Sequence, residues 1–486
     1  IGTFNNGVYQ LDNRKKKFKN HVITSGNHSF FNTEVRSFAE DKTGDVWIGY
    51  YGFGLANIVA GTKSVQRTDQ INSKLTNKNV TSLIYDRRGM LWVGTEGKGV
   101  FRVNPMTSEV TNYSLQSDGF GNDQVFCLYE SKNGTIWAGT WGSGLFFFDE
   151  DQNEFVNTTD YDQPNHIPNT AYITDMLEDA AGTFWVGTLY GLYELSKQSE
   201  NSFAYRLHLP TSDREKIMGT QIQAMVEDQN NDLWVGTIEA LNVKRKGEKE
   251  FQIYPLNDGT RPMALRSILI AHAGNAWIGG NNGLSKFDAT RKTFINYTRD
   301  DGLHSNSFQR RASLASSTGL FFFGTNRGFD SFFPDSIHAT SRNAVVVLTD
   351  LKINNQSVRP GAPDSPLQKH ISLTSDLELS YDQRSFVIDF VALDYGQSPG
   401  YRYCYKLEGF DKDWVCTGSE HSATYTNIDP GQYTFYVKVA NRDGVWIDNQ
   451  VNLTITIHQV FWKTWWAYSI YSVLLTALVY FLIKIR

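Results

Sequence analysis

GMLWVGTEGKGV, residues 89–100, joins a turn, an aromatic residue, a β-branched residue, Gly-Thr and a second glycine turn. Six more stretches repeat the phrase: GDVWIGYYGFGL (44–55), GTIWAGTWGSGL (134–145), GTFWVGTLYGLY (182–193), NDLWVGTIEALN (231–242), GNAWIGGNNGLS (274–285) and GLFFFGTNRGFD (319–330). Their central aromatic residues recur every 43 to 49 residues. A period of this length with short strands and glycine turns predicts a β-propeller with one four-stranded blade per repeat.

The central tryptophans of the phrases are expected in the core. In the second repeat, segments 80–85, 91–93, 99–103 and 110–113 have the β-branched and aromatic content that strands favour. Stacking such sheets face to face buries the tryptophans between blades. This expectation covers Trp47, Trp92, Trp137, Trp185, Trp234 and Trp277.

The glycine turns resemble phosphate-binding fragments, but a nucleotide loop leads from a strand into a helix, whose N-terminus holds the phosphate. Here each turn runs from strand to strand at the blade period. We therefore interpret them as hairpin turns rather than as nucleotide sites.

The beginning of the chain predicts how the ring closes. Ile1-Gly2-Thr3, followed by GVYQLD, matches the end of the repeat phrase. Segments 8–12 and 18–23 then resemble outer strands that lack inner partners. A ring closed by strands from both ends of the chain would pair them and remove exposed sheet edges. We therefore expect a seven-bladed propeller over residues 1–338, preceded by further protein.

The C-terminus carries an uncharged run of 19 residues, Trp465–Ile483. At about 1.5 Å per residue it spans roughly 28 Å, close to the thickness of a bilayer core. Aromatic residues gather at one end, and Lys484 and Arg486 lie at the other. The positive-inside rule then predicts a transmembrane helix over 462–483, with residues 1–461 outside the cytoplasm.

Composition argues against several classes of function. The net charge is −5 with no basic run, so nucleic acid is not an expected partner. The 10 histidines and three cysteines show no zinc spacing, and we expect neither a metal nor a cofactor.

Between the propeller and the membrane run, residues 344–458 contain about seven short strands with alternating hydrophobicity, which fits an immunoglobulin-like sandwich. Cys404 and Cys416 bracket YKLEGFDKDWV. If that hairpin is centred on Phe410, the two cysteines lie opposite each other and within reach of a disulfide. Cys127 is expected as a buried thiol.

The same region resembles a known family. YKLEGFDKDW at 405–414 and ATYTNIDPGQYTFYVKVANRDGVW at 423–446 resemble the triple-tyrosine domain of bacterial sensor proteins, with Tyr405, Tyr425 and Tyr433 as the three tyrosines. The blade phrase resembles the two-component regulator propeller repeat. Together with one span, this order resembles the periplasmic half of a Bacteroides-type hybrid two-component sensor.

The resemblance implies an inner-membrane receptor that binds oligosaccharides and relays the signal to a cytoplasmic histidine kinase and transcription regulator. It implies no enzyme activity for the exterior itself. We expect a homodimer, because a shift in how two exteriors pack would reach two spans. The chain departs from the family pattern in lacking a first propeller, the cytoplasmic domains, a Trp in the seventh repeat and a glycine turn in the fifth.

Ligand contacts are expected on the face that carries the turns between second and third strands. Aromatic faces bind the C–H surfaces of sugars, while polar groups bind hydroxyls. The candidates on this face are Tyr51, Phe53, Trp141, Tyr190, Glu239, Asn281 and Arg327. Trp141 is expected to be exposed. Packing of these aromatics on neighbouring loops is the competing explanation.

Two other classes of function stay open. One is an enzyme, since some propellers are lyases or glycosidases. A glycosidase would need two carboxylates at a set separation, and none can be paired from the sequence. A protein-docking scaffold would need neither a sugar nor a catalytic group.

Overall fold

The computed structural model describes residues 18–21, 23–25, 28–30, 33–62, 65–115, 123–158, 166–199, 202–210, 216–256, 264–337, 345–363, 365–393, 401–418, 420–440, 446, 451–460, 462 and 465–485. The chain divides into two compact units, Ile1–His338 and Ala339–Arg486. Each unit is described by itself.

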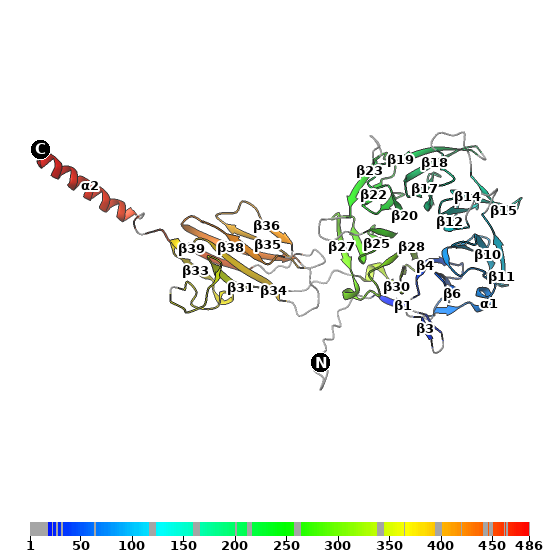
Figure 1. Cartoon of the computed structure of the whole chain (residues 1–486), viewed down its shortest axis with the longest axis horizontal. Helices are drawn as coiled ribbons and strands as arrows, with labels where there is room; N and C mark the ends of the chain where they lie inside the picture. Colours follow the sequence, from blue (N-terminus) through cyan, green and yellow to red (C-terminus); the bar gives the residue numbers. More distant parts are fainter. Residues whose placement is uncertain are drawn as a thin grey trace, which may run out of the picture. The chain divides into compact units, whose positions relative to one another are not determined.

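Four-stranded antiparallel sheets, seven of them among the described residues, build the first unit (Figure 1). The first three, from the innermost strand outward, are β4 (Val35–Glu40), β5 (Val46–Tyr50), β6 (Gly54–Ile58) and β7 (Val65–Arg67); β8 (Val80–Tyr85), β9 (Leu91–Thr95), β10 (Val100–Asn104) and β11 (Glu109–Tyr113); and β12 (Val125–Glu130), β13 (Ile136–Thr140), β14 (Leu145–Asp149) and β15 (Glu154–Asn157).

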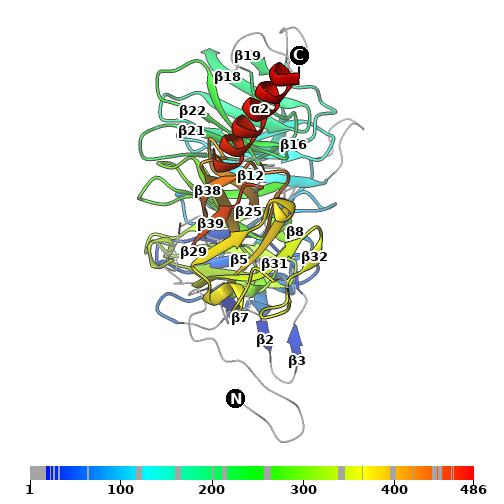
Figure 2. The ribbon, with the colours of Figure 1, turned by 90° about the vertical axis from the view of Figure 1, so that its left-hand side faces the viewer.

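The next three sheets follow the same order along the chain. They are β16 (Ile173–Glu178), β17 (Phe184–Thr188), β18 (Gly191–Ser199) and β19 (Ser202–His208); β20 (Ile222–Glu227), β21 (Leu233–Thr237), β22 (Ala240–Lys244) and β23 (Phe251–Pro255); and β24 (Leu265–Ile270), β25 (Ala276–Gly280), β26 (Leu284–Asp288) and β27 (Thr293–Tyr297). Short additions are the hairpin of β2 (Ile23–Ser25) and β3 (His28–Phe30), seen in Figure 2, and the helix α1 (Asp69–Asn72).

The seventh sheet combines both ends of the unit. Its inner strands are β28 (Phe308–Ala315), β29 (Phe321–Thr325) and β30 (Gly328–Phe332), and its outer strand is β1 (Lys19–His21), which pairs antiparallel with β30. This strand lies within the expected segment 18–23, whereas segment 8–12 lies outside the described residues. Each innermost strand contacts the next, and β28 contacts β4, so the innermost strands surround one axis.

The repeat phrase specifies close contact between neighbouring sheets. Each central tryptophan is at most 8 % exposed, which confirms the predicted burial. The glycine two residues after it lies against the next sheet. A Cβ atom on Gly49 would lie 2.6 Å from Val80, and one on Gly94 would lie 2.7 Å from Val125. A larger residue there would force the sheets apart, which explains the glycine physically.

An aspartate six residues before the tryptophan links turn and core. Asp86 Oδ1 accepts the N–H groups of Arg88 and Met90, while its Oδ2 accepts the indole N–H of Trp92 at 2.7 Å. The bond from these aspartates to the indole was not predicted from the sequence. The same bond joins Asp41 to Trp47, Asp179 to Trp185 and Asp228 to Trp234, and Ser131 accepts from Trp137.

The sixth sheet lacks this acceptor. Ala271 occupies the aspartate position, and among the described residues the buried indole N–H of Trp277 has no hydrogen-bond partner. A buried unpaired donor costs about 1–3 kcal/mol. The turn itself keeps the backbone hydrogen bond seen in the second sheet. The N–H of Gly274 donates to the backbone carbonyl of Ala271, as the N–H of Gly89 donates to the backbone carbonyl of Asp86.

We predict that Ala271→Asp stabilises the first unit by about 1 kcal/mol, because it supplies the missing acceptor within an unchanged turn. Thermal unfolding followed by tryptophan fluorescence measures the effect. Ala271→Leu, which has the same branched arrangement of side-chain heavy atoms as aspartate but no acceptor, is the control. A melting temperature for the aspartate variant at or below that of the leucine variant would contradict the prediction.

Polar side chains tie the innermost strands together. Ser37 Oγ accepts the N–H of Leu83 in the next sheet, and Ser82 Oγ accepts that of Leu128. At the corresponding position of the fourth sheet, Asp175 is buried and its Oδ2 accepts the N–H of Met225. Arg311 of the seventh sheet reaches Asp175, with 2.6 Å between Nε and Oδ1. This ion pair joins sheets that are not neighbours in the ring.

The second unit packs two sheets against one core. One contains β31 (Val345–Ile353), β32 (Gln356–Ser357), β34 (Phe386–Leu393) and β37 (Ser422–Tyr425), and the other contains β33 (Asp376–Leu379), β35 (Arg402–Glu408), β36 (Val415–Gly418), β38 (Gly431–Ala440) and β39 (Val451–Ile457). Phe390 and Ile388 from the first sheet meet Phe435 and Leu453 from the second. The fold class predicted from the sequence, all-β with propeller blades, an immunoglobulin-like sandwich and a C-terminal apolar helix, is confirmed.

Two of the three tyrosines hold this sandwich together through their hydroxyls. Tyr425 donates to Asp411 Oδ2 at 2.7 Å, and the same oxygen accepts the backbone N–H of Leu407, so one carboxylate links β37 of the first sheet to β35 of the second. Burial raises the pKa of Tyr425, which keeps its hydroxyl protonated as a donor. Tyr433, near the start of β38, donates to the carbonyl of Asp429, as a tyrosine corner does.

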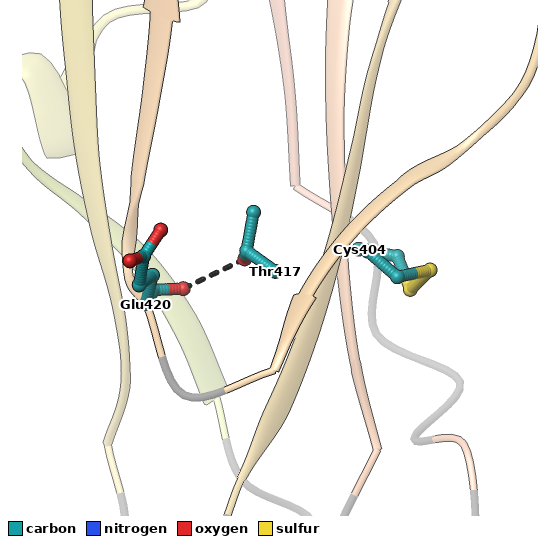
Figure 3. The surroundings of a disulfide bond; sticks show 4 residues. Cys404, Thr417 and Glu420 are labelled. Carbon is teal, nitrogen blue, oxygen red and sulfur yellow. Dashed lines mark hydrogen bonds between the residues drawn. A yellow bond between two sulfur atoms is a disulfide. The ribbon is translucent and has the colours of Figure 1, made fainter. Parts of the chain in front are cut away.

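Cys404 and Cys416 form a disulfide between β35 and β36 (Figure 3). Their Cα atoms are 4.1 Å apart, and they are directly paired in the ladder, as the hairpin register predicted. Directly after Cys416, the hydroxyl of Thr417 donates to the carbonyl of Glu420 in the connection from β36 to β37. Cys127 is buried and remains a thiol.

The helix α2 spans Trp465–Ile485, slightly beyond the predicted end at 483 (Figure 1). It is long and apolar enough to cross a membrane, and almost all of its surface is exposed within the unit. Two of its hydroxyl side chains, those of Ser469 and Thr476, donate to backbone carbonyls one turn earlier.

Candidate functional site

The turns between second and third strands lie on one face of the ring, which we call the turn face. The register shows why: the first residue of each innermost strand pairs with the last residue of the second strand, as Val35 does with Tyr50 and Ile173 with Thr188. The turn face therefore carries all seven predicted ligand contacts, which come from six of the seven sheets.

Exposure differs among these residues. Tyr190 is 65 % exposed, and Glu239, Asn281 and Arg327 are also exposed. Asn281 accepts the N–H of Ala264 through Oδ1 at 2.8 Å, so only part of its amide is available to a ligand.

Trp141 corrects an expectation, because it is half-buried rather than exposed. Its ring packs between Phe126, with centroids 5.0 Å apart, and Tyr172, with centroids 4.9 Å apart. Tyr172 in turn lies edge-on to Tyr190 at 6.3 Å. These four rings form a continuous row, the aromatic row, with Tyr190 at its exposed end.

Tyr51 lies in a charged setting. The guanidinium carbon of Arg36 is 5.0 Å from its ring centroid. The carboxylate of Glu96, beside its hydroxyl, raises the pKa of Tyr51. Phe53 is half-buried and packs edge-on against Tyr50 at 5.8 Å. Tyr51 therefore lies between Arg36 of its own sheet and Glu96 of the second sheet, whereas Phe53 packs on its own sheet.

A further set of residues lies near the axis and was not predicted from the sequence. In all seven innermost strands the register slips beside the turn face, as it does between Val35 and Ser37, and this slip marks a β-bulge. A bulge leaves a residue unpaired and redirects its side chain. The bulge residues are Arg36, Thr81, Phe126, Thr174, Gln223 and Arg266, with Gln309, Arg310 and Arg311 in the longer bulge of β28.

A signal for these residues was present in the sequence. In the first six repeats the bulge residue precedes the central tryptophan by eleven positions, as Arg36 precedes Trp47 and Phe126 precedes Trp137. Among the described residues, no group of three or more His, Cys, Asp or Glu side chains is placed to hold a metal ion.

Comparisons with known proteins match both units. The two-component regulator propeller family matches residues 29–52, 74–97, 119–142, 166–190 and 216–239, and the Y_Y_Y domain family matches 394–458. Histidine kinase P4 of Formosa agariphila is 30 % identical over 320 residues, which cover 66 % of this chain and 23 % of that protein.

Solved structures share the fold. The extracellular domain of the hybrid two-component system BT3049 from B. thetaiotaomicron superposes with a TM-score of 0.70 at 24 % identity, covering 91 % of this chain and 58 % of that chain. A streptogramin B lyase superposes with a TM-score of 0.50 at 13 % identity, covering 65 % of this chain and 97 % of that one. At these identities the superpositions establish fold alone.

Proposed function

Because the chain is built of two-component regulator propeller repeats and a Y_Y_Y domain, we propose that it is the ligand-sensing exterior of a membrane-bound signal-transduction receptor. The observation that carries the proposal is the joint presence of both modules in one chain with an apolar helix, α2. The similarity to a histidine kinase over 320 residues supports the same role. Kinase and regulator activities would belong to parts of the receptor beyond this sequence.

The proposed location is the inner membrane, with residues 1–461 in the periplasm. The aromatic residues at the start of α2 suit a membrane interface, and Lys484 near its end suits the cytoplasmic side. We also propose that the receptor is a homodimer. A ligand would then signal by binding one arrangement of the two protomers better than another.

The proposed ligand is an oligosaccharide bound on the turn face. The aromatic row supports it, because Tyr190 presents an exposed ring on the turn face, where Glu239 of the next sheet and Asn281 of the sheet after that are also exposed. Sugars combine apolar C–H faces with hydroxyls and therefore need both kinds of group.

The test is binding of an oligosaccharide library to the full chain in lipid nanodiscs, followed by chromatography of the recovered glycans. We expect binding without turnover. Cleaved products would instead favour the propeller enzyme, because one fold hosts many functions. If no oligosaccharide binds and none is cleaved, the result favours the protein-docking scaffold.

For any glycan that binds, we predict that Tyr190→Ala weakens the affinity about tenfold, which corresponds to about 1.4 kcal/mol of lost stacking. Met106→Ala is the matched control, because Met106 is 92 % exposed and lies between third and fourth strands, away from the turn face. Equal affinities for both variants would contradict the placement of the ligand.

A further inference from the structure

Three arginines meet near the axis at the turn face. Arg36 and Arg266 occupy the bulge position of β4 and β24, and Arg310 lies in the longer bulge of β28. These strands are consecutive around the ring, since β24 contacts β28 and β28 contacts β4. We call the three residues the arginine cluster.

Their positive charges act on one another. Burial lowers the pKa of Arg310, and the charges of Arg266 and Arg36 lower it further. Burial likewise lowers the pKa of Arg266, where Arg36 adds to the effect and Glu34 opposes it. Like charges held together while partly withdrawn from water destabilise a fold unless something compensates them.

The compensation within the chain is incomplete. Glu34 pairs with Arg36, with 2.5 Å between Oε1 and Nε. Arg266 donates to a neutral acceptor, the carbonyl of Phe308, at 2.9 Å. In the part of the chain that the structure describes, no carboxylate lies within ion-pair distance of Arg266 or Arg310.

The adjacent residue shows the contrast. Arg311 is paired with Asp175, so the fold neutralises one arginine of this bulge and leaves Arg310 without a carboxylate among the described residues. Partly buried guanidinium groups of this kind are preferred partners for carboxylate, sulfate and phosphate oxygens, because their N–H groups form a planar fork.

The aromatic row approaches the same axis from another sector. Phe126 occupies in β12 the bulge position that Arg36 occupies in β4. Arg36 contacts Tyr51, and Phe126 contacts Trp141, in corresponding places. The turn face therefore carries aromatic residues on one side of the axis and the arginine cluster on another, both at the bulge position of the innermost strands.

We infer that the arginine cluster binds an anionic group of the ligand, so that the oligosaccharide sensed here is an acidic one carrying carboxylate or sulfate ester groups. The inference rests on the proposed function for the sugar, whereas the anion site itself does not depend on it.

The first experiment measures thermal unfolding of the full chain in nanodiscs with the anions alone. Inorganic sulfate and galacturonate, each compared with sodium chloride of equal ionic strength, are expected to raise the unfolding temperature of the first unit, and galactose is not. Arg310→Gln is expected to lose this response and to unfold at an equal or higher temperature without anion, because a repulsion is removed. Arg88→Gln, at an exposed ion pair on the opposite face, should keep the response.

The second experiment compares matched probes: trigalacturonate with its methyl ester, and a sulfated carrageenan oligosaccharide with its desulfated form. We expect at least one acidic form to bind tenfold or more tightly than its neutral partner, with the preference lost in Arg310→Gln. The pair that shows the preference distinguishes a carboxylate from a sulfate ester.

Two outcomes separate the proposals. Glycan binding with no charge preference and no anion response overturns the inference and leaves the proposed function standing. An anion response that Arg310→Gln abolishes, without binding by any oligosaccharide, supports the anion site and overturns the proposed sugar ligand. An anion response equal in wild type and Arg310→Gln overturns the inference.

Discussion

Replacing Arg311 by leucine is expected to lower the free energy of unfolding of the propeller unit by about 3–5 kcal/mol, the cost of breaking a buried ion pair. The reason is the group left behind. Asp175 is buried and keeps two backbone donors, Met176 and Met225, but loses its cation. Two neutral donors do not replace a guanidinium at 2.6 Å.

Thermal unfolding of the full chain in nanodiscs measures the effect. The double variant Arg311→Leu/Asp175→Leu is the control, because it removes both charges and keeps apolar volume near the axis. We expect it to recover most of the loss, and the coupling energy from the double-mutant cycle then gives the strength of the pair. A double variant as unstable as the single one would show that the arginine acts through packing rather than through charge.

Raising the pH from 6.5 to 8 is expected to destabilise the same unit by about 2 kcal/mol through Asp330. This carboxyl group is buried in β30, where it accepts the backbone N–H of His304. In the orientation of the Asn20 side-chain amide that satisfies its hydrogen bonds, that amide also donates to Asp330 from the closing strand at 2.8 Å. Burial raises the pKa of Asp330 to about 8.

The sign follows from proton binding. The unfolded chain releases this proton near pH 4, whereas the folded unit retains it up to about pH 8, so the stabilisation is complete below pH 4 and declines by about 1.4 kcal/mol per pH unit up to pH 8. His21, whose pKa burial lowers to about 4, gives the opposite slope below about pH 6.5, and the chosen window avoids it.

Unfolding temperatures at pH 6.5 and 8 for wild type and Asp330→Asn make the comparison. The asparagine variant should lose the pH dependence, because its side chain does not titrate, whereas Asp335→Asn, at an exposed carboxylate five residues later, should retain it. A variant Asp330→Asn with the same decline as wild type would assign the pH dependence to other groups.

Local patterns in the sequence predicted the sheets and the burial of the tryptophans, because both depend on neighbouring residues in one repeat. Trp141 shows where this reasoning ends. It follows a glycine-threonine pair in a turn, which suggested exposure, but Phe126 reaches it from the innermost strand β12 and Tyr172 from the position just before β16. Burial of a turn residue depends on such partners, and no local pattern records them.

The residues near the axis escaped prediction for a related reason. Arg36, Arg266 and Arg310 are far apart in the sequence and meet only because each innermost strand begins beside the axis and contains a bulge. A bulge changes the register by at least one residue, and alternation along a strand does not reveal it. The ion pair of Arg311 with Asp175 depends on the same irregularity.

The pairing of β1 with β30 has a consequence for folding kinetics. His21 contacts Ser331 across 310 residues of chain, whereas the contacts inside the first six sheets are local. Local hairpins form quickly, and closing a long loop requires a large loss of chain entropy before any contact repays it. We therefore expect the first six sheets to form early and this closure to be the slow, final step, during which the outer edge of β30 is exposed to pairing with other chains.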